Sequence, residues 1–169
     1  MSRAAGRAKG STPATLALQR AGVAFSLREY AYAPDGEAIG RQAAAALGID
    51  PARLLKTLIV AGEDGRLAMA LLAVDRTLDL KAAARVLGAK RLAMAGVAEA
   101  ERATGYVKGG ISPFGQKRRL AAAVDAVALE ASPVLVNGGR RGLQIELAPA
   151  DLVRLLDAEV GPIAGPRAA

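Results

Sequence analysis

The stretch RLLKTLIV, residues 53–60, constrains the fold most because it carries apolar side chains on both faces of a predicted strand. With a period of two, one face holds Leu54, Lys56, Leu58 and Val60, and the other holds Leu55, Thr57, Ile59 and Ala61. Apolar residues on both faces are typical of a strand inside a covered sheet. The sequence therefore predicts an interior strand that carries one lysine, Lys56, in apolar surroundings.

Short predicted helices and strands alternate along the chain without a steady βαβ repeat. The helices are expected at 13–21, 38–47, 79–87, 97–104 and 150–156, with a helical turn from Asp50, and the strands at 23–30, 53–60, 67–74, 90–95, 106–108, 118–125 and in a hairpin over 134–147. This order favours one α+β domain with a mixed, mainly antiparallel, barrel-like sheet flanked by short helices. We expect residues 1–11 to form a disordered basic tail, 12–160 the folded domain and 161–169 a flexible C-terminus.

The chain contains no cysteine and no histidine. Disulfides, thiolate chemistry, cysteine-rich zinc sites and histidine-based triads are therefore excluded. Any catalysis must use lysine, carboxylates, hydroxyls, backbone amides or groups of the substrate itself, and no metal or cofactor is expected. The sequence has no apolar span of 18 residues and no hydrophobic stretch in residues 1–11, so we expect a soluble cytoplasmic protein without membrane association.

The formal net charge is +7, but three of the positive charges, Arg3, Arg7 and Lys9, lie in the first ten residues, which contain no acid. The remainder of the chain therefore carries 7 − 3 = +4, which is only a weak indication of a nucleic-acid partner. Three tyrosines and two phenylalanines also offer few platforms on which single-stranded bases could stack.

Lys56 has two interpretations. Its stem could lie on apolar surface while its ammonium group reaches water, as is usual for strand lysines. Alternatively the ammonium is buried, which penalises its charged form and is tolerated mainly at functional sites. The nearest acids in sequence, Asp50 and Glu63, lie outside the strand, so the two interpretations are about equally supported.

Two glycine-rich segments are further candidates. In GYVKGGISPFGQ, residues 105–116, Gly109 and Gly110 would let a ligand approach backbone amides, although the segment taken alone favours an ordinary β-turn. In VNGGRRGL, residues 136–143, the Asn-Gly pair predicts a hairpin turn. The basic residues of and near these segments are candidates for phosphate contacts or for a solvated surface: Lys117, Arg118, Arg119, Arg140 and Arg141.

Five stretches carry a resemblance that spans roughly residues 12–157: TPATLALQRAGVAFSLREY, ALGIDPARLLKTLIV, LDLKAAARVLGAKRLAMA, AERATGYVKGGISPFGQKRRL and GGRRGLQIELAPADL. The chain resembles the YbaK/EbsC family of free-standing bacterial prolyl-tRNA editing proteins, which are related to the editing domain inserted in prolyl-tRNA synthetase. The resemblance implies the fold of this editing domain and, as the activity, hydrolysis of mischarged Cys-tRNA(Pro). It also implies that the substrate's own thiol attacks the ester.

The resemblance also implies residue roles. The essential lysine of the family falls on Lys56, and the glycine loop, which would bind the aminoacyl ester and the terminal adenosine, falls on Gly109 and Gly110 with Ile111 and Ser112. The other predicted substrate-binding residues are Tyr30, Thr57, Asn137 and Gln144. This chain departs from many relatives at Asn137, where they carry serine, at Gln144, where they carry an acid, and at Tyr32, where they carry histidine.

Two alternatives remain open at this stage. The same fold could deacylate a tRNA mischarged with another small amino acid, such as alanine or serine, because Asn137 and Gln144 could alter the pocket. The chain could also be a non-catalytic module that binds tRNA or the synthetase. Since no tRNA-recognition motif is present, selectivity for tRNA is expected to come from prolyl-tRNA synthetase in a transient ternary complex.

Overall fold

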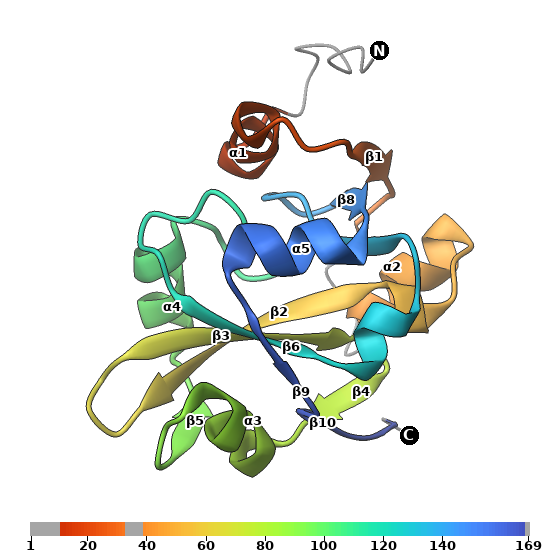
Figure 1. The fold of residues 1–169 in the computed structure, drawn as a ribbon. Helices are drawn as coiled ribbons and strands as arrows, with labels where there is room; N and C mark the ends of the chain where they lie inside the picture. The colour runs from red at the N-terminus through yellow and green to blue at the C-terminus, as the bar shows by residue number, and fades with distance from the viewer. Residues whose placement is uncertain (1–10, 33–38, 168–169) are drawn as a thin grey trace.

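The computed structural model describes residues 11–32 and 39–167, which form a mixed α+β fold (Figure 1). The helices are α1 (Pro13–Ala21), α2 (Ile39–Leu47), α3 (Leu80–Leu87), α4 (Val97–Thr104) and α5 (Pro149–Leu156), with 3-10 helices η1 (Pro51–Arg53) and η2 (Val127–Glu130). The strands are β1 (Ser26–Glu29), β2 (Leu55–Gly62), β3 (Leu67–Ala73), β4 (Arg76–Leu78), β5 (Leu92–Met94), β6 (Ala121–Asp125), β7 (Val134–Asn137), β8 (Leu143–Leu147), β9 (Glu159–Gly161) and β10 (Ala164–Arg167). Residues 1–10 of the predicted tail lie outside the described residues.

The strand that carries Lys56 is β2, and it lies inside a five-stranded sheet of order β5-β2-β3-β6-β9. β2 pairs antiparallel with β3 along its length, through a tight turn in which the Gly62 amide donates to the Arg66 carbonyl (2.8 Å). β3 and β6 pair in parallel, as do β6 and β9. The interior position predicted from the apolar pattern is therefore confirmed.

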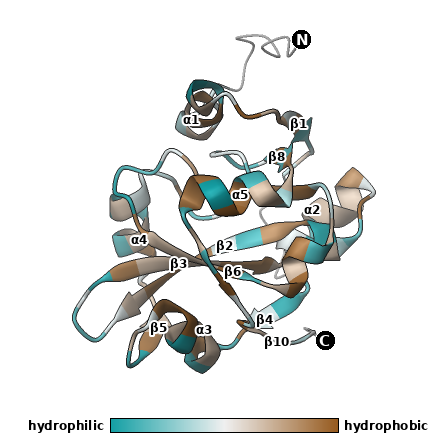
Figure 2. Ribbon diagram, in the orientation of Figure 1, coloured by the Kyte–Doolittle hydropathy of each residue, from teal (hydrophilic) through white to brown (hydrophobic). Residues whose placement is uncertain are grey.

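Each face of this sheet is covered by a different set of elements. Side chains of β3 and β6 such as Leu71 and Val124 pack against Leu152 of α5 and against the β7–β8 hairpin. On the other face, Ala70 packs against the alanines of α3. Figure 1 shows α5 and α3 on opposite sides of the sheet, and Figure 2 shows that the central strands are largely apolar. The described core thus consists almost wholly of aliphatic side chains.

The remaining described strands form two smaller sheets, one of order β1-β8-β7 and one of β4 with β10. All pairings in these two sheets are antiparallel, so the predicted mixed and mainly antiparallel α+β class is confirmed. The three sheets do not close into a barrel. A parallel bridge between Leu54 and Leu135 connects the start of β2 to the β7–β8 hairpin.

Two predicted segments differ from the structure. Residues 106–108 form no strand, because the buried Tyr106 hydroxyl donates to the Phe114 carbonyl (2.5 Å) and holds the segment as part of a loop. The C-terminal segment, expected to be flexible from residue 161, instead contains the end of β9 and all of β10, which pair with β6 and β4.

Several local signals in the sequence act as expected. The Thr12 hydroxyl accepts from the Thr15 amide and caps α1 (3.2 Å), and Asp79 caps α3 by accepting from the Ala82 amide (3.0 Å). In the described part of the chain, no helix is long and apolar enough to cross a membrane.

Candidate functional site

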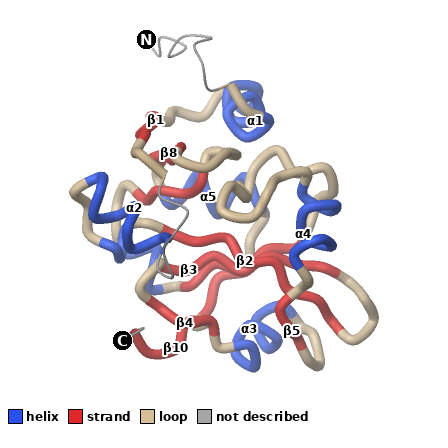
Figure 3. The backbone as a smooth tube through the Cα atoms, turned by 180° about the vertical axis from the view of Figure 1, so that it is seen from behind, coloured by secondary structure: helices blue, strands red, loops and turns tan. Residues whose placement is uncertain are grey.

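A cavity of about 320 Å³ lies along the edge of β2, between α2 and α4. Seen from behind in Figure 3, these two helices flank β2. β5 pairs with β2 only at Val60–Gly62, and the Leu54 bridge to Leu135 lies at the other end. The edge between them faces the cavity, and its lining is mainly apolar, from residues such as Ile59 and Ile111.

The backbone of β2 contributes to this cavity as well as its side chains. The Ile59 carbonyl accepts from the Ala95 amide (3.0 Å) on the β5 side, whereas the Leu54 carbonyl accepts from the Val74 amide (2.9 Å) on the β3 side. Because alternate residues of a strand direct their peptide groups to opposite edges, the peptide groups of Thr57 point to the edge that β5 leaves open. Thr57 can therefore offer a backbone donor and acceptor to a ligand.

Lys56 lines the cavity and is half-buried. Its Nζ donates to the Arg76 carbonyl (2.5 Å). Burial lowers the pKa of Lys56 below its ordinary value of 10.5; the Asp75 carboxylate opposes this shift, and Arg41 reinforces it. The β2–β3 hairpin brings Asp75 near the lysine, although Asp75 is distant in sequence. Lys56 is thus a partly buried cation, with one carbonyl and one acid as its compensation.

A second wall of the cavity comes from the β7–β8 hairpin and the end of β1. Gln144, which is 4% exposed, pairs across the hairpin with Asn137, and both line the cavity with Tyr30. Burial raises the pKa of Tyr30, while hydrogen bonds from the Gln144 side chain and the Gly142 amide partly offset this shift.

Two buried polar atoms of cavity residues lack a hydrogen-bond partner among the described residues. They are Thr57 Oγ1 and Gln144 Oε1. Buried polar atoms are nearly always paired, and an unpaired one costs about 1–3 kcal/mol. Their presence in the same cavity as Lys56 is what a site that completes its hydrogen bonds with a ligand would contain.

The glycine loop meets the cavity at Gly109 and Ile111 but not at Gly110 or Ser112. Gly109 has φ +87°, which favours glycine, and the Gly110 amide donates to the Val107 carbonyl (2.8 Å) in a turn. Ser112 is fully buried, and its Oγ accepts from the Phe114 amide (3.2 Å). Gly110 and Ser112 therefore shape the loop, and the structure does not bring them to the cavity.

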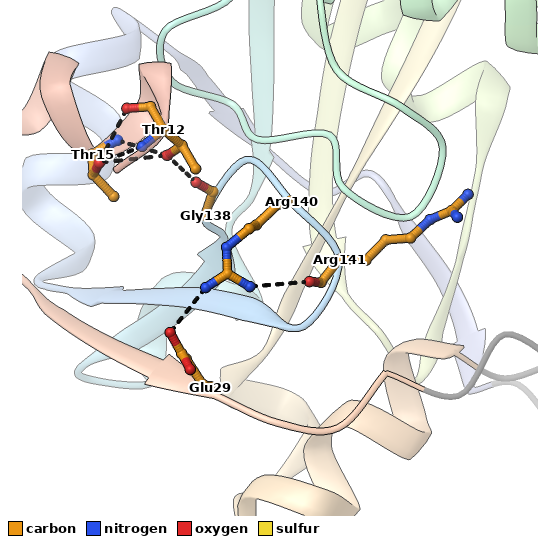
Figure 4. Close-up of polar contacts among 6 residues, drawn as sticks. All are labelled: Thr12, Thr15, Glu29, Gly138, Arg140 and Arg141. Carbon is orange, nitrogen blue, oxygen red and sulfur yellow. Dashed lines mark hydrogen bonds and ion pairs between the residues drawn. The ribbon is translucent and has the colours of Figure 1, made fainter. Parts of the chain in front are cut away.

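The five basic residues predicted to contact tRNA fall into two groups. Arg140 forms an ion pair with Glu29 of β1 (2.9 Å), and the Arg141 Nε donates to the Lys108 carbonyl (2.9 Å). Figure 4 shows the two arginine side chains pointing in different directions from the β7–β8 turn. The second group, Lys117, Arg118 and Arg119, is exposed and makes no ion pair within the described residues.

Sequence reasoning missed other residues of this region. Lys108 lines the cavity beside Gly109, and Val97 and Ala100 of α4 and Gly40 of α2 form parts of its wall. Spacing along the chain carries no signal for these contacts, because distant elements bring them together. Among the described residues, no group of three or more acidic side chains could hold a metal ion.

Comparison with known proteins identifies the family of this chain. Residues 33–155 match the family of aminoacyl-tRNA editing domains. Over 137 residues, 80% of this chain and 84% of the relative, the sequence is 33% identical to a candidate Cys-tRNA(Pro)/Cys-tRNA(Cys) deacylase, EbsC, from Enterococcus faecalis. The chain therefore belongs to the aminoacyl-tRNA editing domain family.

Solved structures show the same fold. A protein described as a candidate trans-editing enzyme for prolyl-tRNA synthetase superposes with a TM-score of 0.80 at 27% identity, over 94% of this chain and all of that one. A hypothetical protein at 24% identity, over 91% of this chain and all of that one, gives a TM-score of 0.81 and supports the fold alone. The predicted α+β editing-domain fold is confirmed.

Proposed function

We propose that this protein is a trans-editing deacylase that hydrolyses the ester joining cysteine to tRNA(Pro). The observation that carries the proposal is the half-buried Lys56 amine in an apolar cavity, in a chain of the aminoacyl-tRNA editing family. The name of the Enterococcus relative and the description of the trans-editing structure support this choice of substrate. Such an activity belongs to translation and would place the protein in the cytoplasm.

The chemistry needs little from the protein, because an aminoacyl ester is already reactive. In the proposed reaction, the substrate's thiol sulfur attacks the ester carbonyl carbon, the bond to the ribose oxygen breaks, and the thiol proton passes to that oxygen. Water then opens the resulting thiolactone to give free cysteine. The chain has to orient the ester, exclude alternative poses and stabilise negative charge on the carbonyl oxygen.

Residues of the cavity are assigned to these tasks. The Lys56 ammonium, which lines the cavity, would neutralise negative charge at the substrate end. Thr57 and Gln144 would supply hydrogen bonds to the aminoacyl group, and Tyr30 would close the wall beside Gln144. Gly109 and Ile111 would line the approach of the ester and the terminal adenosine.

The test is deacylation of purified Cys-tRNA(Pro) by the wild type and by Lys56→Ala. We expect the wild type to release cysteine and the variant to be inactive while remaining folded. Full activity of Lys56→Ala, or no activity of the wild type with or without prolyl-tRNA synthetase, would reject the assignment.

A second candidate substrate is tRNA carrying serine or alanine. It is favoured by the unpaired Gln144 Oε1, which could accept a hydrogen bond from a serine hydroxyl. Parallel assays with Ser-tRNA(Pro) and Ala-tRNA(Pro) separate the candidates. Because serine is the oxygen analogue of cysteine, much slower cleavage of Ser-tRNA(Pro) would support attack by the thiol, whereas equal rates would contradict it.

Contacts with the rest of the tRNA are assigned to the exposed group of Lys117, Arg118 and Arg119. If these residues neutralise phosphates, the KM for whole tRNA should rise with salt, and each removed charge should reduce the slope of log KM against log salt by about one. Turnover that is independent of salt would contradict this contact. Selection of tRNA(Pro) itself is assigned to prolyl-tRNA synthetase in a transient complex.

A further inference from the structure

The two glycine-rich segments, predicted as separate elements, pack directly against each other. A Cβ atom on Gly110 would lie 3.0 Å from Arg140 Cα and 3.0 Å from the Arg141 nitrogen, and one on Gly109 would lie 3.0 Å from the Tyr32 hydroxyl. At such distances a side chain on either glycine would have to displace its neighbours. Residues 107–112 and 137–142 therefore form one unit, called here the double loop.

Two side chains of the hairpin join this unit by hydrogen bonds. Asn137 Nδ2 donates to the Gly109 carbonyl (3.1 Å), while Asn137 Oδ1 accepts from the Gly139 amide (2.7 Å). Arg141 Nε donates to the preceding carbonyl, that of Lys108 (2.9 Å), and its guanidinium lies 5.3 Å from the centre of the Tyr32 ring. Side chains of the hairpin thus hold two successive carbonyls of the glycine loop, those of Lys108 and Gly109.

These hydrogen bonds to the carbonyls also fix the directions in which the N–H groups of the same peptide bonds point. In a trans peptide the C=O and N–H groups point in opposite directions, so the bond from Arg141 to the Lys108 carbonyl directs the Gly109 N–H away from Arg141. The Gly110 N–H is already bonded to the Val107 carbonyl. Within the described residues, the Gly109 N–H has no partner, and Gly109 lines the cavity.

We propose that Asn137 and Arg141 are positioning residues, which orient the Gly109 N–H as the donor that stabilises the ester oxyanion. This inference rests on the proposed deacylase function. It assigns Asn137 to the loop rather than to the substrate, because both ends of its amide are already bonded. It also removes Arg141 from the phosphate contacts, in contrast to the exposed Lys117, Arg118 and Arg119.

The amide of Asn137 suits this task better than a shorter hydroxyl would. A serine hydroxyl can also donate and accept, but through one atom on a shorter side chain, whereas the amide has its donor and its acceptor on separate atoms that reach the Gly109 carbonyl and the Gly139 amide. Asn137 thus forms a side-chain bridge between the two segments of the double loop.

The test compares Arg141→Met, Arg141→Lys and Asn137→Asp with the wild type, measuring kcat, KM and their dependence on salt with Cys-tRNA(Pro). Misplacing the donor is expected to lower kcat by about tenfold in all three variants, with KM and the salt slope unchanged. Arg154→Met, which removes an exposed arginine of α5, is the matched control and should behave as the wild type.

A phosphate contact by Arg141 would give a different pattern. Arg141→Lys would then retain activity, and Arg141→Met would raise KM and reduce the salt slope by about one. That pattern, or an unchanged kcat in Asn137→Asp, would overturn the proposal.

A second measurement does not depend on activity. In 15N-glycine-labelled protein, the Gly109 and Gly110 amide signals should shift and exchange faster in Arg141→Met and Asn137→Asp, while the signal of Gly48 stays unchanged. If the wild type proves inactive on every tRNA tested, the proposed function fails, and these signals alone then decide whether the two side chains hold the loop. Unshifted Gly109 and Gly110 signals would overturn the linkage itself.

Discussion

Two parts of the cavity lining, β2 and the double loop, differ in how completely the polar groups of their side chains are paired. On β2, the Thr57 hydroxyl has no partner among the described residues and burial lowers the pKa of Lys56. In the double loop, both ends of the Asn137 amide are bonded and the Arg141 Nε is taken by the Lys108 carbonyl. Polar groups without a hydrogen-bond partner are available to a ligand, whereas bonded groups hold the shape of the cavity. Polar residues that line one cavity can therefore have different roles.

The largest effect is expected on the β2 wall, from Lys56→Arg. The guanidinium is planar and larger than an ammonium group, so it cannot occupy the same place against the Arg76 carbonyl. We expect kcat/KM for Cys-tRNA(Pro) to fall by at least about a hundredfold. Near-normal turnover in a steady-state deacylation assay would show that only the positive charge of Lys56 matters.

The next effect is expected in the double loop, from Gly109→Ala. At φ +87° an alanine is strained, and its Cβ would lie 3.0 Å from the Tyr32 hydroxyl. We expect the free energy of unfolding to fall by about 1–2 kcal/mol and kcat by about tenfold.

Gly48→Ala is the matched control for this variant. It has φ +67° but nothing within 4 Å of the added Cβ, so it should show the stability loss without the activity loss. Chemical denaturation and deacylation rates measured on both variants make the comparison. Equal activity of the two would mean that the double loop tolerates displacement.

A smaller effect is expected from Thr57→Val, which keeps the shape of the side chain and removes its unpaired hydroxyl. If the hydroxyl bonds only to substrate, folding stability should stay equal or rise by up to about 1 kcal/mol, and kcat/KM should fall about fivefold. Thr77→Val, at an exposed position, is the control. A clear loss of stability in Thr57→Val would indicate that the hydroxyl is paired in the free protein.

The smallest effect concerns the pH dependence of stability in Lys56→Met. Because burial lowers the pKa of Lys56 in the folded state, the unfolded chain binds the proton more tightly, and the charged lysine costs stability at neutral pH. The variant should therefore have a higher free energy of unfolding than the wild type at pH 7.

This gain should shrink as the pH rises from the folded-state pKa towards 10.5, since the wild type loses the penalised proton over that range. Denaturation curves recorded from pH 7 to 10.5 measure it, with exposed Lys90→Met as the control. A variant that is less stable than the wild type at pH 7 would mean that the Asp75 carboxylate outweighs burial.

Much of the fold could be predicted because local pattern and tertiary environment agree. The apolar run of β2 and the Asp-Gly turn after it are stabilised by the sheet that they form, and Asp79 caps α3 within its own turn. β9 and β10 could not be predicted in this way. They are short and rich in glycine and proline, and pairing with β6 and β4, rather than intrinsic propensity, makes them strands.

The residues of the site also divide into those that the sequence could predict and those that it could not. Lys56 stood out because its neighbours in sequence are also its surroundings, and the aliphatic strand alone indicates the cost of the charge. Asp75 and Lys108 could not be predicted as site residues, because only folding brings them near Lys56 and the cavity. Asn137 and Arg141 were noticed for their chemistry, but their tasks depend on distances to carbonyls of another loop, which no spacing along the chain encodes.

The bridge between Leu54 and Leu135 has a consequence for substrate size. It fastens the two sheets together at one end of the cavity, where both leucines are almost completely buried. A bulkier aminoacyl group cannot spread the sheets at that end without breaking the bridge and the packing around it. A wider substrate range, reached by evolution or engineering, would therefore require changes on the helical sides of the cavity, at residues such as Ala43 of α2 and Ala100 of α4. Changes at the bridge between Leu54 and Leu135 would not provide it.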